Sequence, residues 1–243
     1  MRILAFDIET SPVVAYTFSL FKTTITPDKI ISDPEIMCFS AQWMDERKVQ
    51  FYSTFHDGRD EMLQKLWALF DEADILVGYN ITSFDIPWVY GEFIAAGMDV
   101  PSPCQVIDLY QVMKSRTRFP SKKLAYVAPR LIDDSKVTHS GFEMWKQCLA
   151  GDKKAWATMK RYAIADTKLM KPLYEKLRPW IKNHPNLALA SQDLACPVCG
   201  STQVQRRGYS YTNASKFQRY KCNDCGKWSR ASQRLSTTPL RNA

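Results

Sequence analysis

Five short apolar segments in the first 110 residues have the length and the pattern of β-strands. Segment 3–8 is apolar on both faces, as expected of a strand buried in the centre of a sheet. The next two segments are joined by a short polar turn at Asp45-Glu46, a spacing that fits a hairpin, so the sheet should be mixed. The other predicted strands cover residues 35–44, 47–55, 75–77 and 106–109.

Between and after these strands, apolar residues recur at helical spacing. The clearest case is segment 60–73, where Leu63, Leu66 and Phe70 share one helical stripe. Pro172 lies inside the longest such segment and should kink it or mark a junction between two helices. The other predicted helices cover residues 86–96, 121–131, 142–149 and 152–182. Strands followed by alternating strands and helices predict a three-layer α/β domain.

Composition is that of an ordinary globular protein, with 45% hydrophobic and 24% charged residues, which argues against a disordered or fibrous chain. A length of 243 residues fits one large domain, or one with a small appendage. No apolar run approaches the roughly 18 residues of a membrane span, and the N-terminal segment lacks the features of a signal peptide. We therefore expect a soluble, cytoplasmic protein without a membrane partner.

The net charge of +8 is concentrated near the C-terminus. From Cys196 onward there are nine basic residues and one acid, whereas the first 195 residues carry 24 of each sign. A neutral body with a strongly positive tail indicates that the tail faces a polyanion. The alternative is a tail that only improves solubility.

Four of the seven cysteines form two C-x-x-C pairs, separated by a gap of 22 residues that can hold a hairpin with strands near 204–209 and 217–221. Two such pairs offer four thiolates to one tetrahedral zinc ion, with a disulfide pair or a redox site as the alternative. With four cysteine ligands the ion would have no open position, so it should be structural. The predicted ligands are Cys196, Cys199, Cys222 and Cys225. Cys38, Cys104 and Cys148 read as small core hydrophobes.

Acidic residues mark the end of the first strand. Asp7 and Glu9 are two apart and so point to the same side, where two carboxylates about 4 Å apart would repel by roughly 4 kcal/mol. A divalent cation such as Mg²⁺ or Mn²⁺ would relieve this repulsion. Asp85 lies at a predicted entry to a helix, and Asp166 follows Tyr162 by one helical turn. Acids converging from three segments are typical of a two-metal phosphodiesterase, whereas the first pair alone would equally fit two solvated acids.

These residues carry a resemblance to a known family. Phe6-Asp7-Ile8-Glu9-Thr10, Asn80-x-x-x-Phe84-Asp85 and Tyr162-x-x-x-Asp166 resemble the three exonuclease motifs of the DEDD superfamily. The first two are especially similar to the proofreading domain of B-family DNA polymerases, and the resemblance covers about residues 1–180. Arg161 stands where the histidine branch would need histidine, which favours the tyrosine branch. The chain departs from its polymerase relatives in lacking a polymerase domain, so it should act alone or recruit one.

The resemblance implies an RNase H-like fold with a central mixed five-stranded sheet, and 3′→5′ exonuclease activity with two Mg²⁺ (or Mn²⁺) ions. Asp7 would bridge the two ions, Glu9 and Asp166 would complete the site of the attacking water, and Asp85 would support the second ion through water. Tyr162 would orient the nucleophile as a neutral phenol.

Further substrate contacts are predicted in both the α/β domain and the zinc ribbon. Asn80 and Phe84 would contact the 3′-terminal nucleotide, with a turn-forming Asn and a core Phe as the alternative. Asp108 is better explained as a helix cap or a supporting acceptor than as a metal ligand. In the zinc ribbon, basic and aromatic residues alternate as in single-strand binders, although protein docking would use the same surface. The predicted contacts there are Arg206, Arg207, Lys216, Arg219 and Lys221.

The sequence thus predicts an RNase H-like exonuclease domain at 1–185, a linker at 186–195 and a zinc ribbon with a basic tail at 196–243. We expect a 3′→5′ exonuclease acting on single-stranded or frayed DNA, with RNA as a further candidate substrate and a replication or repair protein as a candidate partner. Such a small nuclease would suit a bacterial or phage-infected cell. The alternatives are a structure-specific endonuclease on the same scaffold and a non-catalytic nucleic-acid-binding adaptor.

Overall fold

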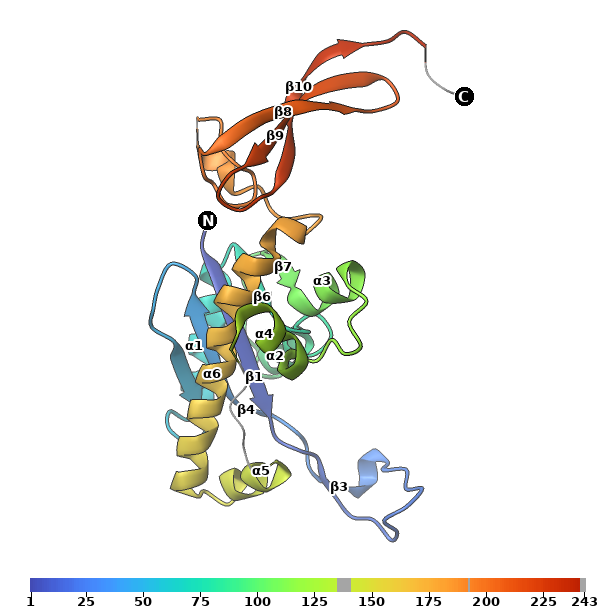
Figure 1. The fold of residues 1–243 in the computed structure, drawn as a ribbon. Coiled ribbons are helices and arrows are strands. Elements are labelled where there is room, and N and C mark those ends of the chain that lie inside the picture. Colours follow the sequence, from blue (N-terminus) through green and yellow to red (C-terminus); the bar gives the residue numbers. More distant parts are fainter. Residues whose placement is uncertain (135–140, 192, 241–243) are drawn as a thin grey trace. The chain divides into compact units, whose positions relative to one another are not determined.

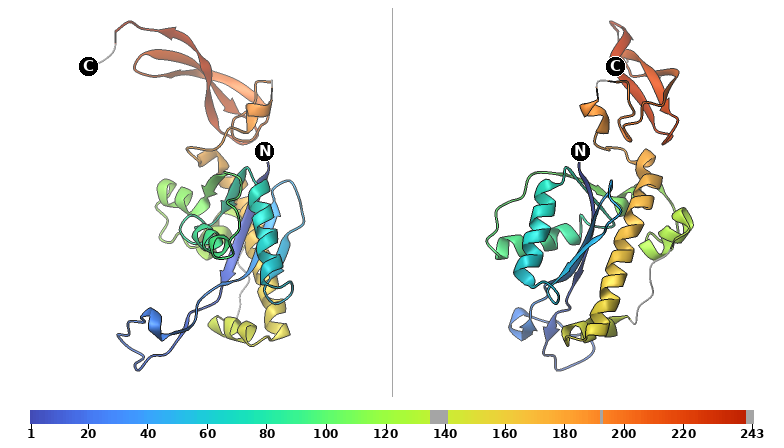
Figure 2. Two further views of the ribbon diagram at one scale, coloured as in Figure 1. Left: turned by 180° about the vertical axis from the view of Figure 1, so that it is seen from behind. Right: turned by 90° about the vertical axis from the view of Figure 1, so that its left-hand side faces the viewer.

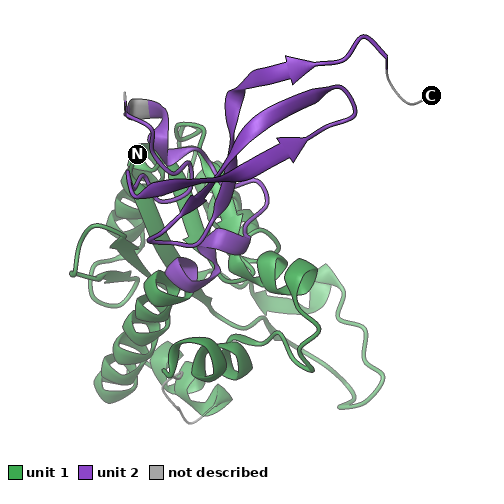
Figure 3. Ribbon diagram, turned by 45° about the horizontal axis from the view of Figure 1, so that its top comes forward, with its two compact units in different colours: residues 1–173 green, residues 174–243 purple. Residues whose placement is uncertain are grey.

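The chain forms two compact units, residues 1–173 and 174–243, in a computed structural model (Figure 3). The structure describes residues 1–134, 141–191 and 193–240. The division falls inside helix α6 (Lys153–Leu177), whereas the sequence placed the end of the first domain at residue 185. The predicted domain limits stay a prediction, and each unit is described here by itself.

The first unit contains the mixed five-stranded sheet that was predicted, in the order β5-β4-β1-β6-β7. Its central strand β1 pairs antiparallel with β4 and parallel with β6. β5 continues the antiparallel side and β7 the parallel side. The strands are β1 (Ile3–Thr10), β4 (Ile36–Trp43), β5 (Gln50–Ser53), β6 (Ile75–Gly78) and β7 (Gln105–Asp108).

Helices cover both faces of this sheet, as Figure 2 shows. On one face α1 (Arg59–Glu72) and α2 (Asp85–Ala95) pack on Leu4, Phe6 and Ile8 of β1. On the other face α6 runs along β1 and β4. α5 (Phe142–Leu149) joins that second layer through Met144 and Cys148. The fold class predicted from the sequence is therefore confirmed.

Two details of the helices differ from expectation. α3 (Leu109–Arg116) follows β7 directly and was not predicted, whereas α4 (Leu124–Ile132) overlaps the predicted helix at 121–131. α6 continues through Pro172, so that residue does not separate two helices. An internal proline costs a helix about 3 kcal/mol, and burial of the neighbouring side chains of Met170, Leu173 and Tyr174 offsets that cost.

A long excursion leaves the sheet between β1 and β4. It contains β2 (Val14–Ala15), a short 3₁₀ turn at Pro27–Lys29 and β3 (Ile30–Ser32), and it projects away from the sheet in all views of Figures 1 and 2. β2 and β3 pair with each other in a two-stranded ribbon. The sequence analysis predicted no structure for this segment.

The second unit consists of a three-stranded antiparallel sheet and two turns that carry the cysteines. β8 (Val204–Tyr211) and β9 (Ser215–Cys222) form the predicted hairpin, longer than expected, and β10 (Trp228–Thr237) adds a third strand that was not predicted. A 3₁₀ turn at Leu187–Ala190 lies within the predicted linker. Among the described residues, no helix is both long and apolar enough to cross a membrane.

Candidate active site and zinc site

Asp7 and Glu9 project from the face of the sheet that α6 covers. Their neighbours Leu4, Phe6 and Ile8 enter the core below α1 and α2, and side chains alternate along a strand. In the β1–β4 ladder Asp7 lies opposite Ser40 and Glu9 lies opposite Cys38, so each pair shares a face. Burial, and then the charges of Glu9 and Asp7, raise the pKa of the Cys38 thiol, which places both carboxylates near it.

α6 is joined to this face by buried hydroxyl groups. The Ser40 hydroxyl donates to the backbone carbonyl of Ala163 at 2.8 Å, and it lies 2.6 Å from the Thr167 hydroxyl. Both hydroxyl-bearing residues are fully buried. On α6, Ala163 and Thr167 directly follow Tyr162 and Asp166, which are themselves buried. The sheet therefore brings the first acidic motif and the last one to a common layer.

Asp85 reaches the same strand from the opposite edge. Pairing of β1 with β6 ends at Ala5 and Val77, and the Asp85 carboxylate Oδ1 accepts the backbone N–H of Ile8 at 3.0 Å. Asp85 is only 3% exposed. Burial, with a smaller contribution from the Asp108 charge, raises the pKa of Asp85 to about 7, although the hydrogen bond from Ile8 opposes the shift. A carboxylate held this way is costly without a cation and stabilised by one.

Asp108 shapes the loop that leads to Asp85. It caps α3 by accepting the N–H groups of Tyr110 and Gln111, and it also accepts those of Asn80 and Thr82. These four bonds use both carboxylate oxygens, so the prediction of a cap and supporting acceptor is confirmed.

The predicted substrate contacts Asn80 and Phe84 lie on this loop. Asn80 adopts a left-handed conformation with φ +70°, and its carbonyl accepts the N–H groups of Ser83 and Phe84. The Phe84 side chain is 39% exposed, so it is not a core residue, and its ring lies 6.3 Å from that of Trp88. An exposed ring at the start of α2, next to Asp85, is available to a ligand.

An apolar pocket of about 300 Å³ lies beyond the end of β1. It is lined by Thr10, Ser11 and Pro12, and by Phe142 and Trp145 of α5. The Trp145 ring lies 6.3 Å from that of Tyr162. The sequence analysis assigned no function to Trp145 or Phe142, because nothing in the local pattern shows that α5 returns to the end of β1.

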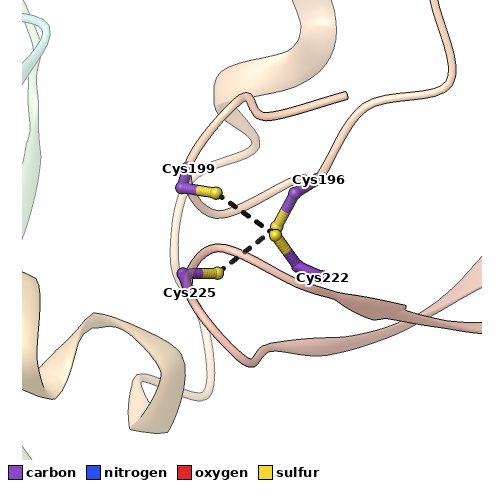
Figure 4. A group of neighbouring side chains, drawn as sticks. All are labelled: Cys196, Cys199, Cys222 and Cys225. Carbon is purple, nitrogen blue, oxygen red and sulfur yellow. Dashed lines mark hydrogen bonds between the residues drawn. The ribbon is translucent and has the colours of Figure 1, made fainter. Parts of the chain in front are cut away.

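The four cysteines of the second unit converge on one point (Figure 4). All four Sγ atoms lie within 4.8 Å of one another, with 3.7 Å between Cys196 and Cys225 and 3.6 Å between Cys199 and Cys222. Four sulfurs at about 2.3 Å from a tetrahedral zinc ion would be about 3.8 Å apart, and a disulfide would need about 2.05 Å. The cysteines are free, so their geometry fits zinc and not the disulfide alternative.

The electrostatics of this cluster favour a thiolate at Cys222. Burial acts against ionisation, but the N–H groups of Cys225 and Asp224 outweigh it and lower the pKa of Cys222 to about 7. The thiolate is the form that binds a metal. Val198 and Val204 complete a small apolar cluster around the sulfurs.

Comparison with known protein families assigns most of the chain. The family model described as the RNase H superfamily matches residues 4–178. The chain belongs to the RNase H superfamily. Residues 189–226 match the InsA N-terminal domain, a zinc-ribbon model, and this range contains all four cysteines of the cluster. A search of the curated proteins finds no relative that matches the chain.

RNase H-like domains use divalent metals, and the donor chemistry of this one fits such ions. Asp7 and Glu9 on β1, Asp85 bonded to β1 and Asp166 on α6 would supply carboxylate oxygens. Among the described residues, however, the four cysteines are the only group of three or more ligand side chains close enough together to hold an ion. Coordination of Mg²⁺ or Mn²⁺ by the four acids therefore stays a prediction.

The predicted contacts of the zinc ribbon divide between two faces of its sheet. Side chains alternate between the two faces along β9, so the odd-numbered Arg219 and Lys221 share one face. The even-numbered Lys216 lies on the opposite face. Arg206 pairs with Tyr220 and shares the face of Lys216, and the carbonyl of Arg207 accepts a bond from Arg219 Nε.

The face of Arg219 carries a ladder of cations and rings. Trp228 pairs with Lys221 and Arg230 pairs with Arg219 across β10. The Arg219 guanidinium lies 4.8 Å from the Trp228 ring, and that of Arg230 lies 4.0 Å from the Phe217 ring. Arg230 was missed in the sequence analysis because β10 was not predicted.

Proposed function

We propose that this RNase H superfamily member is a metal-dependent 3′→5′ exonuclease of the DEDD superfamily, tyrosine branch. Its substrate would be single-stranded or frayed DNA. The observation that carries the proposal is the arrangement around β1: Asp7 and Glu9 face α6, and Asp85 is bonded to Ile8, the residue between them. Tyr162 and Asp166 are one helical turn apart on the helix that covers this face.

In the reaction, a water oxygen forms a bond to the terminal phosphorus, the bond to the 3′ oxygen breaks, and that oxygen takes up a proton. The attacking water gives up a proton in this step; two Mg²⁺ or Mn²⁺ ions, when bound, would lower the pKa of that water and stabilise the negative charge on the leaving oxygen. Asp7, Glu9, Asp85 and Asp166 would hold these ions. The Tyr162 phenol would donate a hydrogen bond that orients the nucleophile.

The chain's fixed geometry supports this role. The Ser40–Thr167 contact fixes α6, and with it Tyr162 and Asp166, against β4. The bond from Ile8 fixes Asp85 at the edge of β1. These bonds limit how far the acidic side chains must move when ions and substrate bind.

Substrate would contact both units. The pocket lined by Pro12, Phe142 and Trp145 is apolar and next to Tyr162, which suits the base of the terminal nucleotide. Asn80 and Phe84 would contact the same nucleotide from the start of α2. The zinc ribbon would grip the strand through its cations and rings, with one structural Zn²⁺ holding the ribbon together.

The proposal is tested by end-labelled oligonucleotides. Asp7→Asn and Asp166→Asn should abolish hydrolysis in Mg²⁺ or Mn²⁺ while leaving oligonucleotide binding nearly unchanged, since both variants keep the shape of the side chain. Asp60→Ala, an exposed acid on α1, is the matched control and should hydrolyse like the wild type. Unchanged turnover in either active-site variant would refute this site. Running DNA and RNA in parallel identifies the preferred substrate.

Superfamily membership is equally compatible with internal cleavage. A circular single strand separates the two modes, because an exonuclease leaves it intact. An adaptor without activity would bind the oligonucleotides and hydrolyse none of them. A replication or repair protein remains a proposed partner of the ribbon.

A further inference from the structure

The excursion between β1 and β4 is a defined structure with a closed base. The N–H of Ser11 donates to the carbonyl of Glu35 at 2.8 Å, and the N–H of Glu35 donates to the Ser11 hydroxyl at 2.9 Å. Residues 12–34, called the arm below, lie between these two positions. Within the arm, β2 and β3 pair, and the N–H of Tyr16 donates to the carbonyl of Lys29 at 2.9 Å.

The tip of the arm, from Tyr16 to Thr23, turns its hydroxyl groups inward. Thr17 donates to the carbonyl of Ser19 at 2.7 Å, and Thr23 donates to the same carbonyl at 2.6 Å. The Ser19 hydroxyl donates to the carbonyl of Phe21 at 3.0 Å. The small polar side chains thus hold the backbone of the tip, in place of facing the solvent as they do in an ordinary loop.

The apolar side chains of the tip point outward. Tyr16, Phe18, Leu20 and Phe21 are each at least 75% exposed, and Phe18 is fully exposed. Exposed apolar residues in isolation are common, but a cluster of them on a structured projection marks an interaction surface.

Charge and position identify the class of partner. From Thr10 to Pro27 the chain has no acidic residue and carries Lys22, whereas the returning part of the arm carries Asp28 and Asp33 beside Lys29, so it is the tip that lacks charge repelling a polyanion. The arm begins three residues after Glu9, and its first residue, Pro12, lines the apolar pocket whose Trp145 ring lies 6.3 Å from that of Tyr162. Flat rings with a nearby cation are what proteins use to stack unpaired bases.

We infer that the arm binds the unpaired strand of a nucleic acid by stacking its bases on Phe18 and Phe21. The inference rests on the proposed function only in taking that strand to be the one whose end enters the active site. The strand would leave the pocket along residues 12–16 and meet the tip several nucleotides from the terminus.

The test is equilibrium binding of a fluorescent single-stranded oligonucleotide to the full chain, in the Asp7→Asn background and without Mg²⁺ or Mn²⁺, so that nothing is cleaved. Phe18→Ala/Phe21→Ala should weaken binding at least about tenfold, the effect of losing one or two stacked bases. Ile94→Ala/Val100→Ala, which removes two equally exposed apolar side chains elsewhere in the first unit, is the matched control and should bind like its parent. Phe18→Leu/Phe21→Leu should bind weakly too, because leucine keeps the hydrophobicity but not the ring.

Base stacking also predicts that an abasic strand of equal length binds the parent and the alanine variant alike. Undiminished binding by either arm variant, or an equal loss on the abasic strand, would overturn the inference. So would a wild-type dimer in sedimentation that the alanine variant turns into monomers, since the arm would then cover a second copy. Hydrolysis of a small nucleotide ester by the wild type tests the proposed catalytic activity with a substrate too short to reach the arm. A wrong proposal about catalysis would therefore be seen separately from a wrong inference about strand binding by the arm.

Discussion

The hydroxyl groups of Ser40 on β4 and Thr167 on α6 lie 2.6 Å apart in the fully buried layer between the sheet and the helix. Ser40 stands opposite Asp7 in the ladder, and Thr167 directly follows Asp166. This contact therefore joins the strand residue opposite the first acidic motif to the helical turn that carries the last one.

Removing this contact should slow the reaction and destabilise the fold. Ser40→Ala removes the bond to the Ala163 carbonyl and the contact with the Thr167 hydroxyl, which keeps only the backbone carbonyl of residue 40 at 3.3 Å, at a cost of about 1–3 kcal/mol in the free energy of unfolding. Because the helix carries Tyr162 and Asp166, we expect kcat to fall with little change in KM. Thr167→Ser, which keeps the hydroxyl, should restore both values relative to Thr167→Val.

Thr158→Ala is the matched control on the same helix, since that partly exposed hydroxyl donates to the Lys154 carbonyl and accepts a bond from Arg161, both on α6 itself. Urea unfolding measures the free energy of unfolding, and steady-state kinetics measure kcat and KM. A Ser40→Ala protein with wild-type kcat would contradict a positioning role.

Asp85 and Asp108 are neighbouring buried carboxylates with opposite roles, and amide substitution separates them. Asp85→Asn keeps the acceptor for the Ile8 N–H and removes a charge that burial disfavours, so without Mg²⁺ this variant should be at least as stable as the wild type. Asp108→Asn weakens charge-assisted bonds to four N–H groups and should lose about 1–3 kcal/mol.

Metal response gives the second readout. Mg²⁺ should raise the melting temperature of Asp108→Asn and of the wild type but not that of Asp85→Asn, whose activity should fall about 10–100-fold. Thermal unfolding with and without Mg²⁺ measures this. Equal stabilisation of all three proteins by Mg²⁺ would show that Asp85 does not contribute to ion binding.

The sequence predicted the five-stranded sheet and the cysteine cluster because both depend on local signals, whereas the metal site of the four acids stays a prediction. The apolar run of β1, its two acids and the C-x-x-C pairs are visible in a few adjacent residues. β10 was missed because the segment from Trp228 to Thr237 is mostly polar and is held as a strand by pairing with β9. The Ser40–Thr167 contact joins residues 127 apart, and no pattern within either element indicates it.

Gly78 shows how backbone space shapes the loop before Asp85. A Cβ at this position would collide with the Cγ2 of Ile81 and lie 3.0 Å from the carbonyl oxygen of Phe6. Gly78→Ala should therefore displace the loop at Asn80 and cost about 1–3 kcal/mol. Gly91→Ala in α2 is the matched control: a Cβ there meets nothing within 4 Å, and alanine should add about 0.5–1 kcal/mol.

The rate of hydrolysis should depend on whether the substitution displaces the loop before Asp85. Gly78→Ala should lower turnover as well as stability, because the loop carries Phe84 and leads into Asp85, whereas Gly91→Ala should not lower stability. Chemical denaturation and oligonucleotide hydrolysis give both quantities. Wild-type stability in Gly78→Ala would mean that Ile81 repacks without moving the loop.

The cysteine cluster predicts that zinc and the fold of the second unit are lost together. A closed site of four thiolates contributes binding energy directly to folding, on the order of 10 kcal/mol. Cys222→Ser should lose the single bound zinc and expose residues 174–243 to proteolysis, while the first unit, with its own core, stays resistant. Cys104→Ser, a partly buried thiol outside the cluster, should keep one zinc per chain. Metal analysis and limited proteolysis measure both; a full zinc content in Cys222→Ser would contradict four-cysteine coordination.

The two faces of the ribbon sheet should contribute unequally to strand binding. Trp228 and Arg230 lie on the face of Arg219 and Lys221, whereas Lys216 lies on the other face with its amine 3.8 Å from the Tyr209 ring. Trp228→Ala should weaken binding of a single strand at least about fivefold without changing its salt dependence, because a ring stacks on a base and releases no counterion. Arg230→Ala should reduce the slope of log K against log salt concentration by about 0.7, the value for one phosphate contact on a single strand. Lys216→Ala should reduce that slope by less, and an equal reduction would mean that the strand contacts both faces.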